Sequence, residues 1–109
     1  MEKTEFLPLG TICIVKGNTK KLMIIARGLA TVIEGSTVHF DYGACLYPEG
    51  LLGDSLIYFN SEDIQKKVHE GFTNDENELA LESLNEALTE ADLPKGNVKQ
   101  LQQAQRNGG

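Results

Sequence analysis

The chain has 109 residues, of which 40% are apolar and 24% charged, and its formal net charge is -6 at pH 7. This length fits one compact domain with a single core, and this composition is typical of a globular chain rather than a disordered or fibrous one. Residues 61–109 carry ten acidic and five basic side chains, so nucleic acid and anionic lipid surfaces are excluded as favourable partners.

The ends and cysteines of the chain indicate where the protein works. Residues 1–15 lack the charged and then apolar layout of a secretory signal peptide. No apolar run approaches the ~20 residues that a membrane-spanning helix needs. We therefore expect a cytoplasmic protein without stable membrane insertion. In a reducing cytosol Cys13 and Cys45 are expected to be buried thiols, and a disulfide would require their two strands to lie side by side.

Five short apolar or β-branched runs, separated by turn residues, fill the first half of the chain. The sequence predicts strands over residues 11–15, 22–26, 31–33, 37–47 and 56–59. Short strands with tight turns favour a small curled sheet. The expected fold class is therefore α+β, with a five-stranded curled antiparallel sheet or an SH3-like barrel followed by two C-terminal helices.

The two helices are predicted from caps and helical spacing. The first begins at Asn60 or Ser61, places Ile64 and Val68 on one face, and ends at Gly71. The second begins with a capping box at residues 73–76 and ends before the Leu93-Pro94-Lys95-Gly96 segment. Its apolar stripe consists of Ala80, Leu81, Leu84, Ala87, Leu88 and Ala91. We predict one α+β domain over residues 1–96, with the sheet in 6–60 and the helices in 61–93, and a flexible tail over 97–109.

Motifs for catalysis, metal binding or cofactor binding are not found in the sequence. There is no phosphate-binding loop, dinucleotide glycine pattern or CxxC. A nucleophile with a base could come only from Cys13 or Cys45 with His39, but six residues of strand separate Cys45 from His39 by roughly 20 Å. We expect a protein that is not an enzyme and holds no metal or cofactor, and keep a small enzyme using Cys45 or His39 as an alternative.

Two groups of side chains have both a structural and a functional interpretation. Leu81, Leu84 and Leu88 either pack on the sheet or offer a surface to a partner helix. Lys20, Lys21 and Arg27 are either solubilising charges or a contact patch for an acidic partner surface. The sequence alone leaves both questions open.

Four segments together resemble a family of small bacterial proteins of unknown function. They are Leu7-Pro8-Leu9-Gly10-Thr11, the run from Thr19 to Gly28 (TKKLMIIARG), the run from Phe40 to Gly50 (FDYGACLYPEG), and Tyr58-Phe59-Asn60 with Ile64 and Gly71-Phe72. Proteins of this family occur mainly in Gram-positive bacteria, often encoded beside type VII secretion genes and their LXG-type toxins. The resemblance covers roughly residues 6–78.

This resemblance implies a partner, and the partner would be a secreted toxin. The expected function is that of an accessory chaperone or targeting factor that binds an LXG-type toxin, and the alternative is an immunity protein that neutralises such a toxin. Tyrosine and arginine are frequent at interface hot spots. The residues predicted to bind the partner are Arg27, Asp41, Tyr42, Tyr47, Glu49, Leu81, Leu84 and Leu88.

Overall fold

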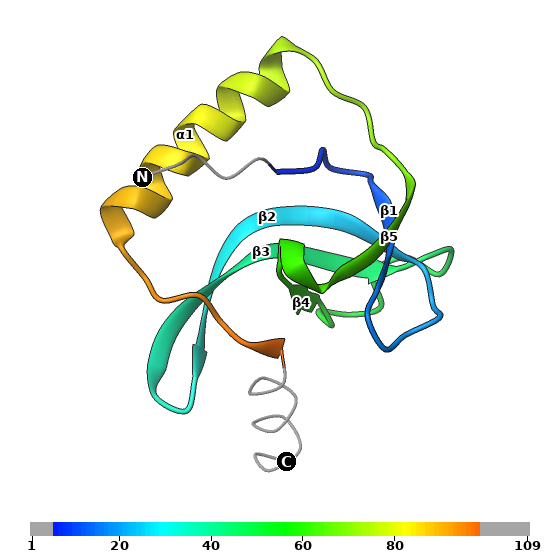
Figure 1. The fold of residues 1–109 in the computed structure, drawn as a ribbon, viewed down its shortest axis with the longest axis horizontal. Coiled ribbons are helices and arrows are strands. Elements are labelled where there is room, and N and C mark those ends of the chain that lie inside the picture. The colour runs from blue at the N-terminus through cyan, green and yellow to red at the C-terminus, as the bar shows by residue number, and fades with distance from the viewer. Residues whose placement is uncertain (1–5, 99–109) are drawn as a thin grey trace.

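One antiparallel sheet and one helix make up the fold of residues 6–98, the part of the chain that the computed structural model describes (Figure 1). The elements in chain order are β1 (Ile12–Val15), β2 (Leu22–Ile33), β3 (Ser36–Leu46), β4 (Ile57–Phe59), the short 3₁₀ helix η1 (Ser61–Asp63), β5 (Ile64–His69) and α1 (Asp75–Ala91). The strand order across the sheet is β4-β3-β2-β1-β5. This confirms the predicted α+β class and five-stranded antiparallel sheet, but the sheet is open and does not close into a barrel.

The two predicted strands at residues 22–26 and 31–33 are one long strand, β2. It pairs with β3 from Leu22 opposite Leu46 to Ile33 opposite Ser36, and the register shifts between Ile24 and Ala26. Gly28 has a φ of 61° inside this strand. Glycine tolerates this left-handed conformation, so the strand bends here without ending. The long β2–β3 hairpin is therefore curled (Figure 1).

The prediction of two helices between residues 61 and 93 is wrong, because the first of them is η1 followed by strand β5. β5 pairs antiparallel with β1, from Val15 opposite Ile64 to Ile12 opposite His69. A helix this short is marginal on its own. Pairing with the open edge of β1 instead satisfies the backbone of both segments. The outer strand carries Lys66 and Lys67, both exposed, a pattern that protects sheet edges from aggregation.

The core lies on the face of the sheet that α1 crosses. Its buried members are Phe6, Cys13, Val15, Leu22, Ile24, Tyr42, Ala44 and Phe59. The rings of Phe6 and Tyr42 meet edge to face, with centroids 5.9 Å apart. The helix packs on this core without being enclosed by it, since none of its residues is fully buried. It starts after Asn74, whose side chain accepts a hydrogen bond from the Asn77 N–H, one residue later than the predicted threonine cap.

After α1, residues 93–96 lie along the outer edge of β3, and we call this segment the C-terminal strap. The His39 N–H donates to the Pro94 carbonyl at 2.9 Å, and the Gly96 N–H donates to the His39 carbonyl at 2.7 Å. Gly96 also packs against the ring of Phe40, leaving no room for a side chain at position 96. Of the predicted tail, 97–109, residues 99–109 lie outside the described residues, and Val98 packs against the core.

Candidate functional site

Two of the residues predicted to bind a partner, Asp41 and Tyr42, are buried and make internal contacts. Oδ2 of Asp41 accepts from the Ser61 N–H at 2.8 Å and lies 3.0 Å from Nζ of Lys95. The hydroxyl of Tyr42 accepts from the Leu7 N–H at 3.0 Å. These side chains connect η1, the strap and the N-terminal segment to β3. A contact with a partner through them stays a prediction, and it would require these packed segments to move.

Arg27 connects the sheet to the helix. Its Nη1 donates to Oδ1 of Asn77 at 2.7 Å and to the Leu7 carbonyl at 3.4 Å. Partial burial lowers the pKa of the guanidinium, while the nearby Tyr42 acts in the opposite direction. The group remains charged at neutral pH because an arginine pKa starts so high. In this structure Arg27 therefore fixes the start of α1 and the N-terminal segment over β2.

The leucine stripe of α1 faces the sheet. Leu81, Leu84 and Leu88 are partly buried and pack against the core, and Leu84 lies directly on Gly28 of β2. This arrangement corresponds to the packing interpretation of the stripe. Contact of these leucines with a partner stays a prediction that requires α1 to leave the sheet.

The remaining two predicted residues, Tyr47 and Glu49, are exposed on the loop between β3 and β4. This loop lies beside the β1–β2 loop, since the Tyr47 N–H donates to the Lys21 carbonyl at 3.0 Å and Nζ of Lys20 lies 2.6 Å from Oε2 of Glu49. The hydrogen bond from Lys20 lowers the pKa of Glu49, so this carboxyl group is ionised at neutral pH. Both loops lie at the end of the sheet opposite the β2–β3 turn (Figure 1).

Apolar side chains are exposed on the β3–β4 loop. Tyr47 is 41% exposed, Leu51 46% and Leu52 59%. We call the exposed side chains of these two adjoining loops, Lys16, Lys20 and Lys21 of one and Tyr47, Leu51 and Leu52 of the other, the loop face. Leu51 and Leu52 were not predicted from the sequence. Two adjacent leucines between Gly50 and Gly53 were the available signal, because a loop bounded by glycines rarely buries large side chains.

Exposed apolar side chains also occur beside the start of α1. Leu9 is 47% exposed and Phe72 80%. Their two segments are in contact, because the Gly71 N–H donates to the side-chain Oγ1 of Thr11 at 3.1 Å. Position 71 packs so closely on the Leu9 carbonyl that only glycine fits there.

The outer face of α1 is acidic. Between residues 75 and 92 the chain carries seven acidic side chains and no basic one, and all seven are exposed. They are Asp75, Glu76, Glu78, Glu82, Glu86, Glu90 and Asp92. The first three lie at the helix N-terminus, where negative charge is favourable, but Glu78, Glu82, Glu86 and Glu90 repel one another at i,i+4 spacing. The acidic helix and the lysines of the loop face give the two ends of the molecule different charge.

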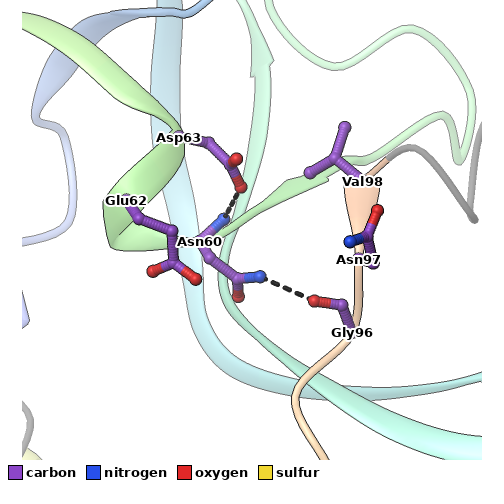
Figure 2. Close-up of a pocket in the computed structure, with 6 residues that line it drawn as sticks. All are labelled: Asn60, Glu62, Asp63, Gly96, Asn97 and Val98. Carbon is purple, nitrogen blue, oxygen red and sulfur yellow. Dashed lines mark hydrogen bonds between the residues drawn. The ribbon is translucent and has the colours of Figure 1, made fainter.

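A small pocket of about 230 Å³ lies between η1 and the strap (Figure 2). It is lined by Asn60, Glu62, Asp63, Gly96, Asn97 and Val98. The amide of Asn60 donates to the Gly96 carbonyl at 2.8 Å, and the Asn60 N–H donates to Oδ2 of Asp63 at 2.8 Å (Figure 2). The polar groups of Asn60, Asp63 and Gly96 therefore form hydrogen bonds with one another. The lining residues include neither histidine nor cysteine.

The candidate nucleophiles and base are dispersed. Nδ1 of His39 lies 3.0 Å from the Leu93 carbonyl. Cys13 on β1 and Cys45 on β3 are free, buried thiols with β2 between their strands. Burial raises the pKa of Cys13 to about 11, so its thiol is neutral at pH 7. Among residues 6–98 there is no group of three or more His, Cys, Asp and Glu side chains that could hold a metal ion.

No helix within residues 6–98 is long and apolar enough to cross a membrane.

The chain matches one known protein family. No curated protein and no solved structure was found to match the chain. Residues 6–81, which include the whole sheet and the start of α1, match the family described as Domain of unknown function (DUF4176), and the chain belongs to this family.

Proposed function

We propose that this chain is a non-enzymatic cytoplasmic accessory protein, a chaperone or targeting factor that binds a secreted LXG-type toxin of a type VII system. The observation that carries the proposal is the loop face, where Tyr47, Leu51 and Leu52 expose apolar surface on the β3–β4 loop, beside the β1–β2 loop. Grouped apolar side chains on a protein surface are a common mark of a protein-binding site. The choice of a toxin as partner rests on the gene neighbourhood that the sequence resemblance implies.

A targeting factor needs a stable fold that presents a binding surface, and it needs no reactive centre. The internal contacts of Asp41, Tyr42 and Arg27 stabilise such a fold, while the β3–β4 loop carries the accessible apolar groups. Tyrosine is among the residues most often found at interface hot spots. Binding would cover the exposed leucines and add about 25 cal/mol for each Å² of apolar surface removed from water.

The test is co-expression of this chain with the toxin encoded beside its gene, followed by purification through a tag on the toxin. We expect the two proteins to purify together, and export of the toxin to fail when the gene is deleted. Leu51→Asp/Leu52→Asp should abolish co-purification. Val32→Asp is the matched control, because Val32 is 63% exposed beside the β2–β3 turn at the other end of the sheet. A toxin that purifies alone and is exported without this protein would refute the proposal.

An immunity protein is the second candidate, and the acidic outer face of α1 favours it. Seven exposed carboxylates, six on α1 and one just after it, would compete with phosphate groups for the basic cleft of a toxin that acts on nucleic acid. In that case deletion of the gene would sensitise the cell to killing by its siblings while export of the toxin continued. Loss of export without sensitisation favours the accessory protein instead.

A further inference from the structure

We propose that the loop face binds an amphipathic segment of its partner that is apolar on one side and acidic at its flanks. This inference rests on the proposed function for the identity of the partner, but its chemistry follows from the residues of the loop face. The apolar part of the site is formed by Tyr47, Leu51 and Leu52, which are 41%, 46% and 59% exposed. These side chains require apolar groups opposite them.

The charges of the loop face indicate which residues should flank the apolar part of the bound segment. Residues 16–21 and 47–56 carry three lysines and two acids, a net charge of +1, whereas the whole chain has a net charge of -6. One of the acids, Glu49, is already paired with Lys20 at 2.6 Å. Lys16 and Lys21 are exposed and form no ion pair within residues 6–98. Their ammonium groups are therefore available to carboxylates of a partner.

The acidic helix disfavours an acidic segment at that end of the molecule. The six carboxylates of α1 and Asp92 just after it repel such a segment, and the exposed Phe72 and Leu79 lie close to them in the sequence. The loop face combines apolar side chains with two lysines, Lys16 and Lys21, that form no ion pair within the described part of the chain. Like charges opposed in an interface are strongly unfavourable, so this distribution selects the docking position as well as the partner.

The two loops are also held in a fixed relation before a partner binds. The Tyr47 N–H donates to the Lys21 carbonyl, Gly50 N–H donates to the Leu46 carbonyl at 2.7 Å, and the Lys20–Glu49 ion pair spans the two loops. Gly50 and Gly53 have φ values of 84° and 65°, which let the β3–β4 loop turn back twice. A surface ordered in advance pays less entropy when a partner binds.

The first experiment needs no toxin. A synthetic helical peptide with leucines on one face and glutamates on its flanks is titrated into the isotopically labelled protein, and amide chemical shifts are recorded. We expect shifts confined to residues 16–21 and 47–56, and no saturable shifts with the same peptide carrying lysines in place of glutamates. Equal or stronger binding of the lysine peptide, or shifts centred on α1, would overturn the inference.

The second experiment uses variants against the glutamate peptide and, separately, against the purified toxin. Leu51→Asp/Leu52→Asp should raise Kd by about 30-fold or more. Lys16→Glu/Lys21→Glu should raise it about 10-fold at low ionic strength, and much of this difference should vanish in high salt. Lys66→Glu/Lys67→Glu, the same charge change on the exposed edge strand β5, is the matched control and should leave Kd within about 2-fold. Circular dichroism checks that every variant is folded.

The two proposals can fail separately. A toxin that binds the wild type and all the loop-face variants with the same Kd leaves the accessory function standing and overturns the docking site. A glutamate peptide that maps to the loop face, together with a toxin that does not bind, supports the chemistry of the site and refutes the toxin as partner.

Discussion

The ammonium group of Lys95 lies 3.0 Å from Oδ2 of Asp41, a carboxylate whose side chain is only 3% exposed. Lys95 belongs to the C-terminal strap and Asp41 to β3, so this ion pair closes the fold after the helix. On its other side Lys95 lies 2.9 Å from Oε2 of Glu62, which follows β4. Together with the backbone hydrogen bonds of His39, these pairs fix the strap to the edge of the sheet.

Removal of the Lys95 charge should destabilise the protein. Lys95→Met leaves the buried carboxylate of Asp41 without its cation, although the Ser61 N–H still bonds to it. Because Lys95 is partly exposed and water replaces it in part, we expect a loss of about 1–2 kcal/mol in the free energy of unfolding, measured in urea. Asp41→Asn combined with Lys95→Met should cost less than the sum of the two. Lys67→Met, which breaks the exposed Lys67–Glu70 pair, serves as control and should cost under about 0.5 kcal/mol. Equal effects at positions 95 and 67 would contradict this account.

Replacement of Gly28 should cost less stability when Leu84 is shortened. A Cβ at position 28 would overlap Cδ1 of Leu84, and the φ of 61° adds backbone strain for any other residue. We expect Gly28→Ala to lower the free energy of unfolding by about 2–3 kcal/mol, against about 1 kcal/mol for Gly35→Ala, where the φ is 82° but no atom lies within 4 Å. In the Leu84→Ala background the cost of Gly28→Ala should fall by about 1 kcal/mol. Additive effects of Gly28→Ala and Leu84→Ala on the free energy of unfolding would show that Leu84 does not pack tightly against position 28 of β2.

Both thiols should be protected from modification in the folded protein. Cys13 is 0% exposed and Cys45 2%, and the raised pKa of Cys13 removes the reactive thiolate at neutral pH. Labelling with an aromatic disulfide reagent should therefore be ~1,000-fold slower than in denaturant, since it requires the fold to open. Ser55→Cys, on the exposed β3–β4 loop, should label at the rate of a free thiol. Rapid labelling of one native cysteine would mean that its strand opens locally.

Stability should fall in alkaline solution, through Lys95 and Cys13. Partial burial works to lower the pKa of Lys95, but the hydrogen bonds and charges of Glu62 and Asp41 raise it above the ordinary value of 10.5. Burial raises the pKa of Cys13 from 9.0 to about 11. A group whose pKa is higher in the folded state stabilises fully below its unfolded pKa, and this stabilisation is lost as the pH rises through the folded pKa.

The free energy of unfolding should therefore decrease from about pH 9 through pH 11 for Cys13, and above pH 10.5 for Lys95. Urea unfolding at a series of pH values measures the slope. Cys13→Ala and Lys95→Met should each make it shallower, whereas Lys67→Met should not. A wild-type stability that rises over this range would contradict the assigned shifts.

Local residue patterns were enough to predict several elements of this fold. The β-branched run at β1, the apolar and aromatic run at β4 and the alternating run at β3 predict strands within a residue or two of the observed bounds. The acidic, capped start and apolar stripe of α1 predict both the helix and the face that packs on the sheet. In each case the periodicity of apolar residues within the segment matches the side that the fold covers.

The sequence predicted less about the candidate site. Tyr47 and Glu49 are exposed in the loop where turn residues placed them, but Asp41 and Tyr42, from the same resemblance segment, are buried. Apolar and polar residues alternate over residues 38–42 of β3, a pattern that favours a core position for Tyr42. Nothing local indicates that Asp41 is covered, because its partners Ser61 and Lys95 come from elements far along the chain.

The sequence by itself determined the α+β class of the fold, the strand segments of β1 to β4 and the long helix, since these follow from interactions between neighbours in the chain. Only the tertiary structure decided that residues 64–69 form a strand, that Gly28 bends β2 without ending it, and that the strap closes over β3. The physical reason is that a strand obtains its hydrogen bonds from another segment. The open edge of β1, which no local pattern reveals, therefore outweighed the helical spacing of Ile64 and Val68.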